Sequence, residues 1–157
     1  MTSKTQLQSK IQELEIETGV PGDTLEDGSI VLKKENGLAL LVAPASTEVV
    51  CQWSKDFPEV FSKLQEEGFN PSQWFVPTLT HLQLACKFIP NHFSAKAGRC
   101  YWSSTEIDSA SAYLLFYNAG ITGINSINGI ADDNGKGCTF CVRAFRYVSC
   151  PSCPRFY

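Results

Sequence analysis

The stretch Ser29-Ile-Val-Leu-Lys-Lys-Glu-Asn-Gly-Leu-Ala-Leu-Leu-Val-Ala43 predicts a β-hairpin near the start of the chain. Two runs rich in aliphatic residues flank Asn36 and Gly37, and both of these turn residues tolerate positive φ angles. A two-residue turn of this kind reverses the chain and places the two runs side by side as antiparallel strands. We therefore expect the main domain to open with a sheet.

Residues 3–18 are expected to form a helix that precedes the hairpin. Leu7, Ile11 and Leu14 lie on one face with the spacing of a coiled-coil seam, over about two heptads. Gly19 ends the helical pattern. The apolar stripe has two interpretations, which are an oligomerising or attachment segment and an amphipathic helix that packs on its own domain.

Two further helices are expected after the hairpin. The first spans residues 58–67 and has a proline in its first turn, and the second spans residues 80–89, where Thr80 and Gln83 form a capping-box pair. The rest of the chain is predicted to form strands at residues 101–104, 112–117 and 139–148. A long loop-like segment, residues 118–137, lies between the last two strands. Because helices and strands are segregated along the chain, the predicted fold class is α+β.

The 157 residues are expected to form an N-terminal helix at 1–20, one domain at 21–148 and a Cys-rich tail at 149–157. Thirteen Lys and Arg residues against sixteen Asp and Glu residues give a net charge of -3 without a basic run, so nucleic acid is not an expected partner. No apolar run approaches a membrane span, and the start lacks an apolar signal core. Neither membrane insertion nor signal-peptide export is expected.

A series of motifs in the second half of the chain carries a resemblance to a known family. The motifs are Trp74-Phe-Val-Pro-Thr78, Tyr101-Trp-Ser-Ser-Thr-Glu106 and Cys141-Val-Arg-Ala-Phe-Arg146. With the opening hairpin, they resemble the Lcl C-terminal-domain-like family, the C-terminal domain of bacterial collagen-like adhesins, found in bacterial surface and phage proteins. The resemblance covers about residues 22–148. It implies a C-type lectin-like fold, with a small mixed sheet, two helices and a long irregular loop region.

The resemblance also implies a non-enzymatic module for adhesion or recognition. A virion made in the host cytoplasm reaches the outside without a signal peptide, so we expect a phage virion protein that attaches to a host-surface glycan. One alternative is a purely structural virion protein, such as a capsid or tail decoration without a ligand. Another is a bacterial surface adhesin. The expected protein partners are other virion proteins or copies of the chain itself, with a trimer as one form.

The candidate ligand-binding residues are aromatic, amide and carboxylate side chains in and beside the 118–137 loop, because such groups bind sugars without net charge. They are Tyr113, Tyr117, Asn125, Asn128, Asp132, Asp133 and Asn134. The motif residues have a structural interpretation instead, with Trp102 as a core aromatic and one of the two arginines as an ion-pair partner of Glu106. This structural set is Trp74, Trp102, Glu106, Arg143 and Arg146.

Seven cysteines raise the question of a metal site. The pairs Cys138 with Cys141 and Cys150 with Cys153 have the spacing of a tetrahedral zinc site. A strand through the first pair would point its two thiols to opposite faces, so buried thiols or a disulfide are preferred over zinc.

Calcium and catalysis are two further alternatives. Calcium binds oxygen ligands, and side-chain oxygens are available in the loop and near the end of a strand, at Asp132, Asp133, Asn134, Glu106 and Asp108. The sequence Asp-Asp-Asn-Gly is also common in turns that bind no metal. A cysteine nucleophile with His81 or His92 as its base has no motif that brings the groups together. We therefore expect neither a cofactor nor a catalytic residue.

Overall fold

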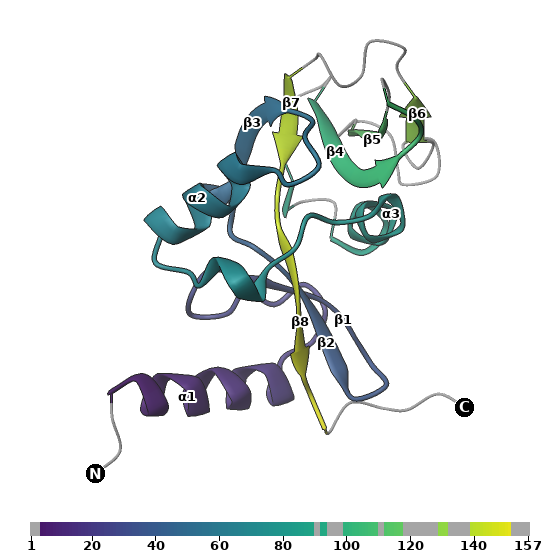
Figure 1. Cartoon of the computed structure of the whole chain (residues 1–157). Helices are drawn as coiled ribbons and strands as arrows, with labels where there is room; N and C mark the ends of the chain where they lie inside the picture. The colour runs from purple at the N-terminus through teal and green to yellow at the C-terminus, as the bar shows by residue number, and fades with distance from the viewer. Residues whose placement is uncertain are drawn as a thin grey trace.

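The computed structural model describes residues 4–89, 92–93, 99–109, 112–117, 129–131 and 139–151. This part of the chain contains three α-helices and two β-sheets, which confirms the α+β class. The two sheets lie at opposite ends of the molecule, and the run from β7 to β8 passes from one to the other (Figure 1). The first helix lies at the same end as the smaller sheet.

The described helices are α1 (Lys4–Thr18), α2 (Pro58–Glu66) and α3 (Leu79–Phe88), with short 3-10 helices at Ala45–Thr47 and Pro71–Gln73. The smaller sheet is antiparallel and has the order β1 (Ile30–Glu35), β2 (Leu38–Val42), β8 (Phe145–Ser149). The larger sheet has the order β3 (Val49–Gln52), β7 (Thr139–Val142), β4 (Arg99–Glu106), β5 (Ala112–Tyr117), β6 (Gly129–Ala131). Its β4 and β7 are parallel, and its other neighbours are antiparallel.

The predicted hairpin is confirmed, with Asn36 and Gly37 at its two-residue turn. Their φ angles are 54° and 77°, and a type I′ turn needs positive values at both positions. In the resulting register, Leu40 of β2 is opposite Lys33 of β1 and opposite Tyr147 of β8. The turn sets the pairing of Lys33 with Leu40, and the contact between β2 and β8 adds Tyr147, so the three side chains form a row across the smaller sheet.

Each face of the smaller sheet packs against an apolar cluster. Leu40 and Phe145 belong to a buried cluster that also contains residues of α3. Leu41 points to the other face, where it packs in a cluster with Ile16 of α1 and with Cys150. Because successive strand residues alternate between faces, this three-layer arrangement explains why β2 is apolar along most of its length.

The predicted structural role of Trp102 is confirmed. Its side chain is fully buried in β4, and its indole Nε1–H donates a hydrogen bond to the carbonyl oxygen of Cys51 at 3.1 Å. Trp74 is also buried and packs edge-to-face on Phe69 at 5.5 Å between ring centroids. Arg146 lies over the Trp74 ring, 5.8 Å from its centroid. These motif residues therefore belong to the packing of the domain.

The prediction of one continuous strand at 139–148 is wrong, because the strand breaks at Arg143 and Ala144. Arg143 is only 2% exposed; its guanidinium donates to the carbonyl oxygen of His92 at 2.7 Å and pairs with Glu48 at 3.2 Å. Of the two arginines that could pair with Glu106, Arg143 pairs with Glu48 instead, and Glu106 is exposed at the end of β4. A buried guanidinium requires polar partners, and the break in the strand directs it to them.

Three other expectations change in detail. The third helix begins at Leu79, and its capping box is formed by Thr78 and His81 instead of Thr80 and Gln83. The short strand β3 was not predicted, and β6 lies inside the segment predicted as loop. Both strands are short, and their extended conformation depends on pairing with a neighbour, β7 for β3 and β5 for β6.

Of the ion pairs Arg143–Glu48 and Lys63–Glu67, the first is expected to contribute more to stability, because it is the more deeply buried. We predict that Glu48→Ala lowers the free energy of unfolding by about 3 kcal/mol, because it leaves a buried guanidinium without its carboxylate. Glu67→Ala, which removes the partner of Lys63 in a half-exposed i,i+4 pair, should cost only about 0.5 kcal/mol and is the matched control. Urea unfolding measures both, and equal losses would contradict the prediction.

Candidate functional site

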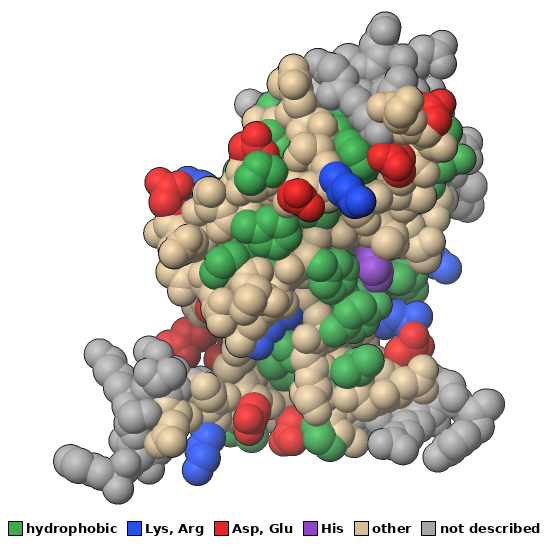
Figure 2. All heavy atoms as spheres, in the orientation of Figure 1, with side chains coloured by type: hydrophobic (Ala, Val, Ile, Leu, Met, Phe, Trp, Pro, Cys, Tyr) green, Lys and Arg blue, Asp and Glu red, His purple; other side chains and the backbone are tan. Residues whose placement is uncertain are grey.

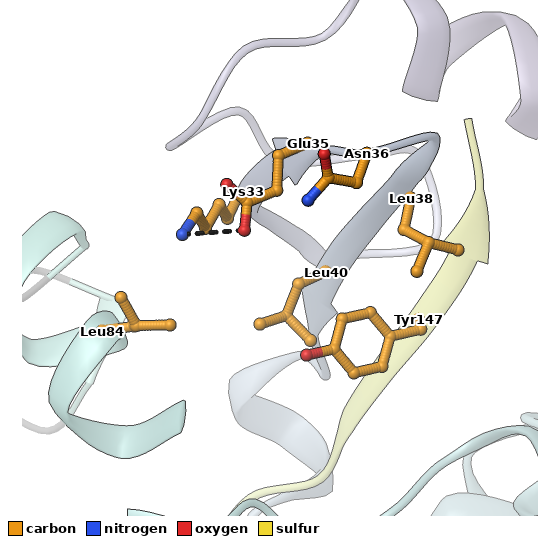
Figure 3. A pocket seen from close by; sticks show the side chains of 7 residues that line it. All are labelled: Lys33, Glu35, Asn36, Leu38, Leu40, Leu84 and Tyr147. Carbon is orange, nitrogen blue, oxygen red and sulfur yellow. Dashed lines mark ion pairs between the residues drawn. The ribbon is translucent and has the colours of Figure 1, made fainter. Parts of the chain in front are cut away.

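A pocket of about 200 Å³ lies between the smaller sheet and α3 (Figure 3). All three strands of the sheet contribute to it, and one leucine of α3 closes it from the opposite side. The lining residues are Lys33, Glu35, Asn36, Leu38, Leu40, Leu84 and Tyr147. The pocket is thus built on the predicted hairpin and the last strand.

The polar part of the pocket comes from β1 and the hairpin turn. Lys33 and Glu35 are two residues apart on β1 and lie on the same face, where their charged groups form an ion pair at 3.0 Å. Asn36 follows at the turn and adds an amide, which both donates and accepts hydrogen bonds. The opposite charges of the pair compensate each other, so this side of the pocket offers donors and acceptors without net charge.

Tyr147 is the aromatic side chain of the pocket, and two neighbours hold its ring. Phe75 stacks against it with the centroids 5.6 Å apart and the ring planes inclined by 20°. The Tyr147 hydroxyl lies 3.0 Å from Nε2 of His81. Although the side chain is half-exposed, its orientation is therefore set before any ligand arrives.

His81 connects the pocket to the start of α3. Its Nδ1 accepts a hydrogen bond from the backbone N–H of Thr78 at 3.1 Å, which requires an unprotonated Nδ1. The ring proton then resides on Nε2, which donates to the Tyr147 hydroxyl. Burial lowers the pKa of His81 below its usual value of 6.5. The neutral ring thus serves two neighbours at once.

The chemistry of the pocket suits an uncharged polar ligand. Leu38, Leu40 and Leu84 provide apolar surface, the tyrosine provides a ring, and the ion pair with the amide provides hydrogen-bonding groups. On the face shown in Figure 2, acidic and basic side chains are interspersed, and apolar side chains gather beside a histidine. A volume of about 200 Å³ accommodates a small group or one unit of a larger ligand.

The predicted ligand-binding residues are not part of this pocket in the described structure. Tyr113 is half-buried on β5, and its carbonyl oxygen accepts a hydrogen bond from the Ser103 hydroxyl at 2.6 Å. Tyr117 pairs through its backbone with Arg99 of β4. The others, Asn125, Asn128, Asp132, Asp133 and Asn134, lie outside the described residues.

The candidate zinc ligands differ in their chemical state. Cys141 carries a buried reduced thiol on β7, whereas Cys150 is buried and disulfide-bonded. A sulfur in a disulfide carries no thiolate charge for a metal ion. Cys138 and Cys153 lie outside the described residues. Within the described ranges, no three His, Cys, Asp or Glu side chains are grouped to hold a metal ion.

The other described candidates for calcium binding and for catalysis are either exposed or engaged in other interactions. Glu106 and Asp108 are exposed at and just beyond the end of β4. His81 is engaged in the helix cap and with Tyr147. Burial, Glu59 and Cys141 together raise the pKa of the Cys51 thiol to about 11, so this thiol is protonated at neutral pH. An activated cysteine nucleophile has the opposite shift.

The residues that form the pocket were not predicted as a site. Period-2 alternation in the hairpin sequence does place Lys33 and Glu35 on one face, and Leu38 and Leu40 on one face. This alternation predicted a sheet but did not predict a pocket. Nothing in the sequence pairs the hairpin with Tyr147, because the β2–β8 contact joins segments about a hundred residues apart.

The sequence matches no protein-family model and has no match among curated proteins. In the part of the chain that the structure describes, no helix combines the length and the apolar character needed to cross a bilayer.

We predict that His81 makes the stability of the domain depend on pH. Because its pKa is lower in the folded state than in the unfolded state, the unfolded state binds the proton first as pH falls. The free energy of unfolding should therefore decrease as pH falls from about pH 7 to about pH 5. Measurements of urea unfolding across this range test the prediction.

The matched variant is His81→Asn, whose side-chain oxygen replaces Nδ1 as acceptor for the Thr78 N–H but does not titrate. This variant should lose the decrease between about pH 7 and about pH 5, while His92→Asn, at the other histidine of the chain, should retain it. A His81→Asn protein with the same pH profile as the parent would contradict the assignment.

Proposed function

We propose that this chain is a non-enzymatic recognition module that binds an uncharged saccharide in the pocket between the smaller sheet and α3. The observation that carries the proposal is the Tyr147 ring, half-exposed at the pocket and held by Phe75 and His81. Sugars present apolar C–H faces that stack on aromatic rings, and a ring that is already oriented loses little entropy on binding. Their hydroxyls match the mixed donors and acceptors nearby.

The charge balance favours a neutral ligand over an anionic one. The Lys33 ammonium, which would be the natural contact for a sulfate or phosphate, is paired with Glu35 at 3.0 Å. The whole chain carries a net charge of -3, which repels polyanions at long range. A neutral saccharide avoids both costs, because it competes with neither charge of the pair.

We further propose that the α+β arrangement is C-type lectin-like, as the motif resemblance implies. In support, the last described strand, β8, pairs with β2 of the opening hairpin, so that both ends of the domain meet in one sheet. The larger sheet lies at the opposite end of the molecule (Figure 1). The 118–137 segment, in and beside which the sequence places the candidate ligand-binding residues, connects strands of that larger sheet.

The biological setting stays a prediction. From the resemblance to bacterial surface and phage proteins, we propose that the saccharide belongs to a host cell surface and the module to a virion. A purely structural virion protein is the second candidate, and the exposed apolar stripe of α1 favours it, because decoration proteins bind their neighbours through such surfaces. Saturable sugar binding distinguishes the two functions.

The test is a screen of neutral oligosaccharides from bacterial surfaces, followed by calorimetry on the sugars that bind. Tyr147→Ala should raise the dissociation constant at least about tenfold, because it removes the stacking surface. Phe88→Ala is the matched control, since both aromatic side chains are 49% exposed and Phe88 does not line the pocket. Its affinity should equal that of the parent protein.

Two outcomes would contradict the proposal. If no saccharide binds saturably, the structural alternative is preferred. If a saccharide binds but Tyr147→Ala leaves its affinity unchanged, the pocket is not the binding site. Combined alanine substitutions at Asn125, Asn128 and Asp132 then test the predicted loop surface in the same assay.

A further inference from the structure

The helix α1 exposes three large aliphatic side chains on one face. Leu7 is 54% exposed, Ile11 is 41% exposed and Leu14 is 61% exposed. The stripe therefore does not pack on its own domain, and that interpretation of the sequence is wrong. Three large exposed aliphatics aligned along one helix form an apolar face of the kind that binds a partner.

The domain holds α1 by its other side. Ile16 is 4% exposed and packs in the cluster behind the smaller sheet. The Gln12 side-chain amide donates to the Asp27 carboxylate at 2.7 Å, and the Lys34 ammonium donates to the carbonyl oxygen of Glu17 at 2.9 Å. The helix is thus already formed and anchored, so a partner need not supply the cost of helix nucleation.

The spacing of the exposed residues assigns a heptad register. Leu7 and Leu14 occupy d positions and Ile11 occupies the a position between them. In this register the buried Ile16 is at f, on the side opposite the a/d seam. The contact with the domain and the exposed seam are therefore on different sides of the helix, and a β-branched residue at a with leucine at d favours two strands.

The charges beside the seam are complementary for two parallel copies. Lys10 is at g and Glu15 is at e of the following heptad, and in a parallel pair these positions face each other across the seam. Lys10 is exposed, and one oxygen of the Glu15 carboxylate is held by the backbone N–H of Glu26 at 2.7 Å. Each copy would thus place its Lys10 against Glu15 of the second copy.

We propose that α1 joins two copies of this chain as a parallel, two-stranded coiled coil through Leu7, Ile11 and Leu14. Because the seam covers about two heptads, the association is weak and depends on protein concentration. The dimer would carry two pockets, so binding to a surface with repeated ligands gains from avidity. The inference itself does not rest on the saccharide proposal.

The experiment is sedimentation equilibrium of the full chain over a wide range of concentrations. The parent protein should form a dimer, and the seam variant Ile11→Ser with Leu14→Ser should have a dissociation constant at least about tenfold higher. Val50→Ser is the matched control, because Val50 is 61% exposed on β3, away from α1, and its substitution should leave the dimer unchanged. Thermal unfolding confirms that each variant is folded.

A charge exchange tests the parallel arrangement. Lys10→Glu alone and Glu15→Lys alone should each weaken the dimer, since each places like charges across the seam. An equimolar mixture of the two variants should recover the parent affinity, because every facing pair is again opposite in charge. Four results would overturn the proposal. The parent protein could be monomeric at every concentration, or it could form a trimer. The seam variant could dimerise as tightly as the parent, or the mixture of charge variants could fail to recover the parent affinity.

Discussion

The buried guanidinium of Arg143 is the constraint on which the rest of the structure depends. It lies where the chain passes from β7 to β8, and it bonds to Glu48 and to the carbonyl oxygen of His92. Its charge also stacks over the Phe93 ring, 4.7 Å from the centroid. A charge with so little contact with water is tolerated only when its partners are arranged around it, so this residue fixes where one strand ends and the next begins.

The position of that break determines the candidate site. β8 starts at Phe145, and in its register with β2 Tyr147 lies opposite Leu40. The same strand pairs by a bridge with Phe75, whose ring stacks on Tyr147. A shift of one residue would turn Tyr147 to the opposite face, toward α1. The aromatic side of the pocket thus depends on the register between β2 and β8.

One imidazole connects Tyr147 of the pocket to the start of α3. His81 accepts the Thr78 N–H at the helix start and donates to the Tyr147 hydroxyl, so one side chain completes the cap and orients the ring. Burial keeps this imidazole neutral by lowering its pKa. The histidine therefore has two structural bonds, and a raised pKa keeps the buried thiol of Cys51 in its protonated form.

Local patterns in the sequence determined the α+β class, the Asn36–Gly37 turn and the apolar stripe of α1, because each depends on residues that are close together in the chain. Whether that stripe is exposed was decided by the tertiary structure. The burial of Trp102 followed from its setting in a strand. Only the tertiary structure decided the partner of Arg143 and the pocket around Tyr147, since both join segments far apart in the sequence. Such pairings are selected by packing and by the desolvation of charge, which no local pattern records.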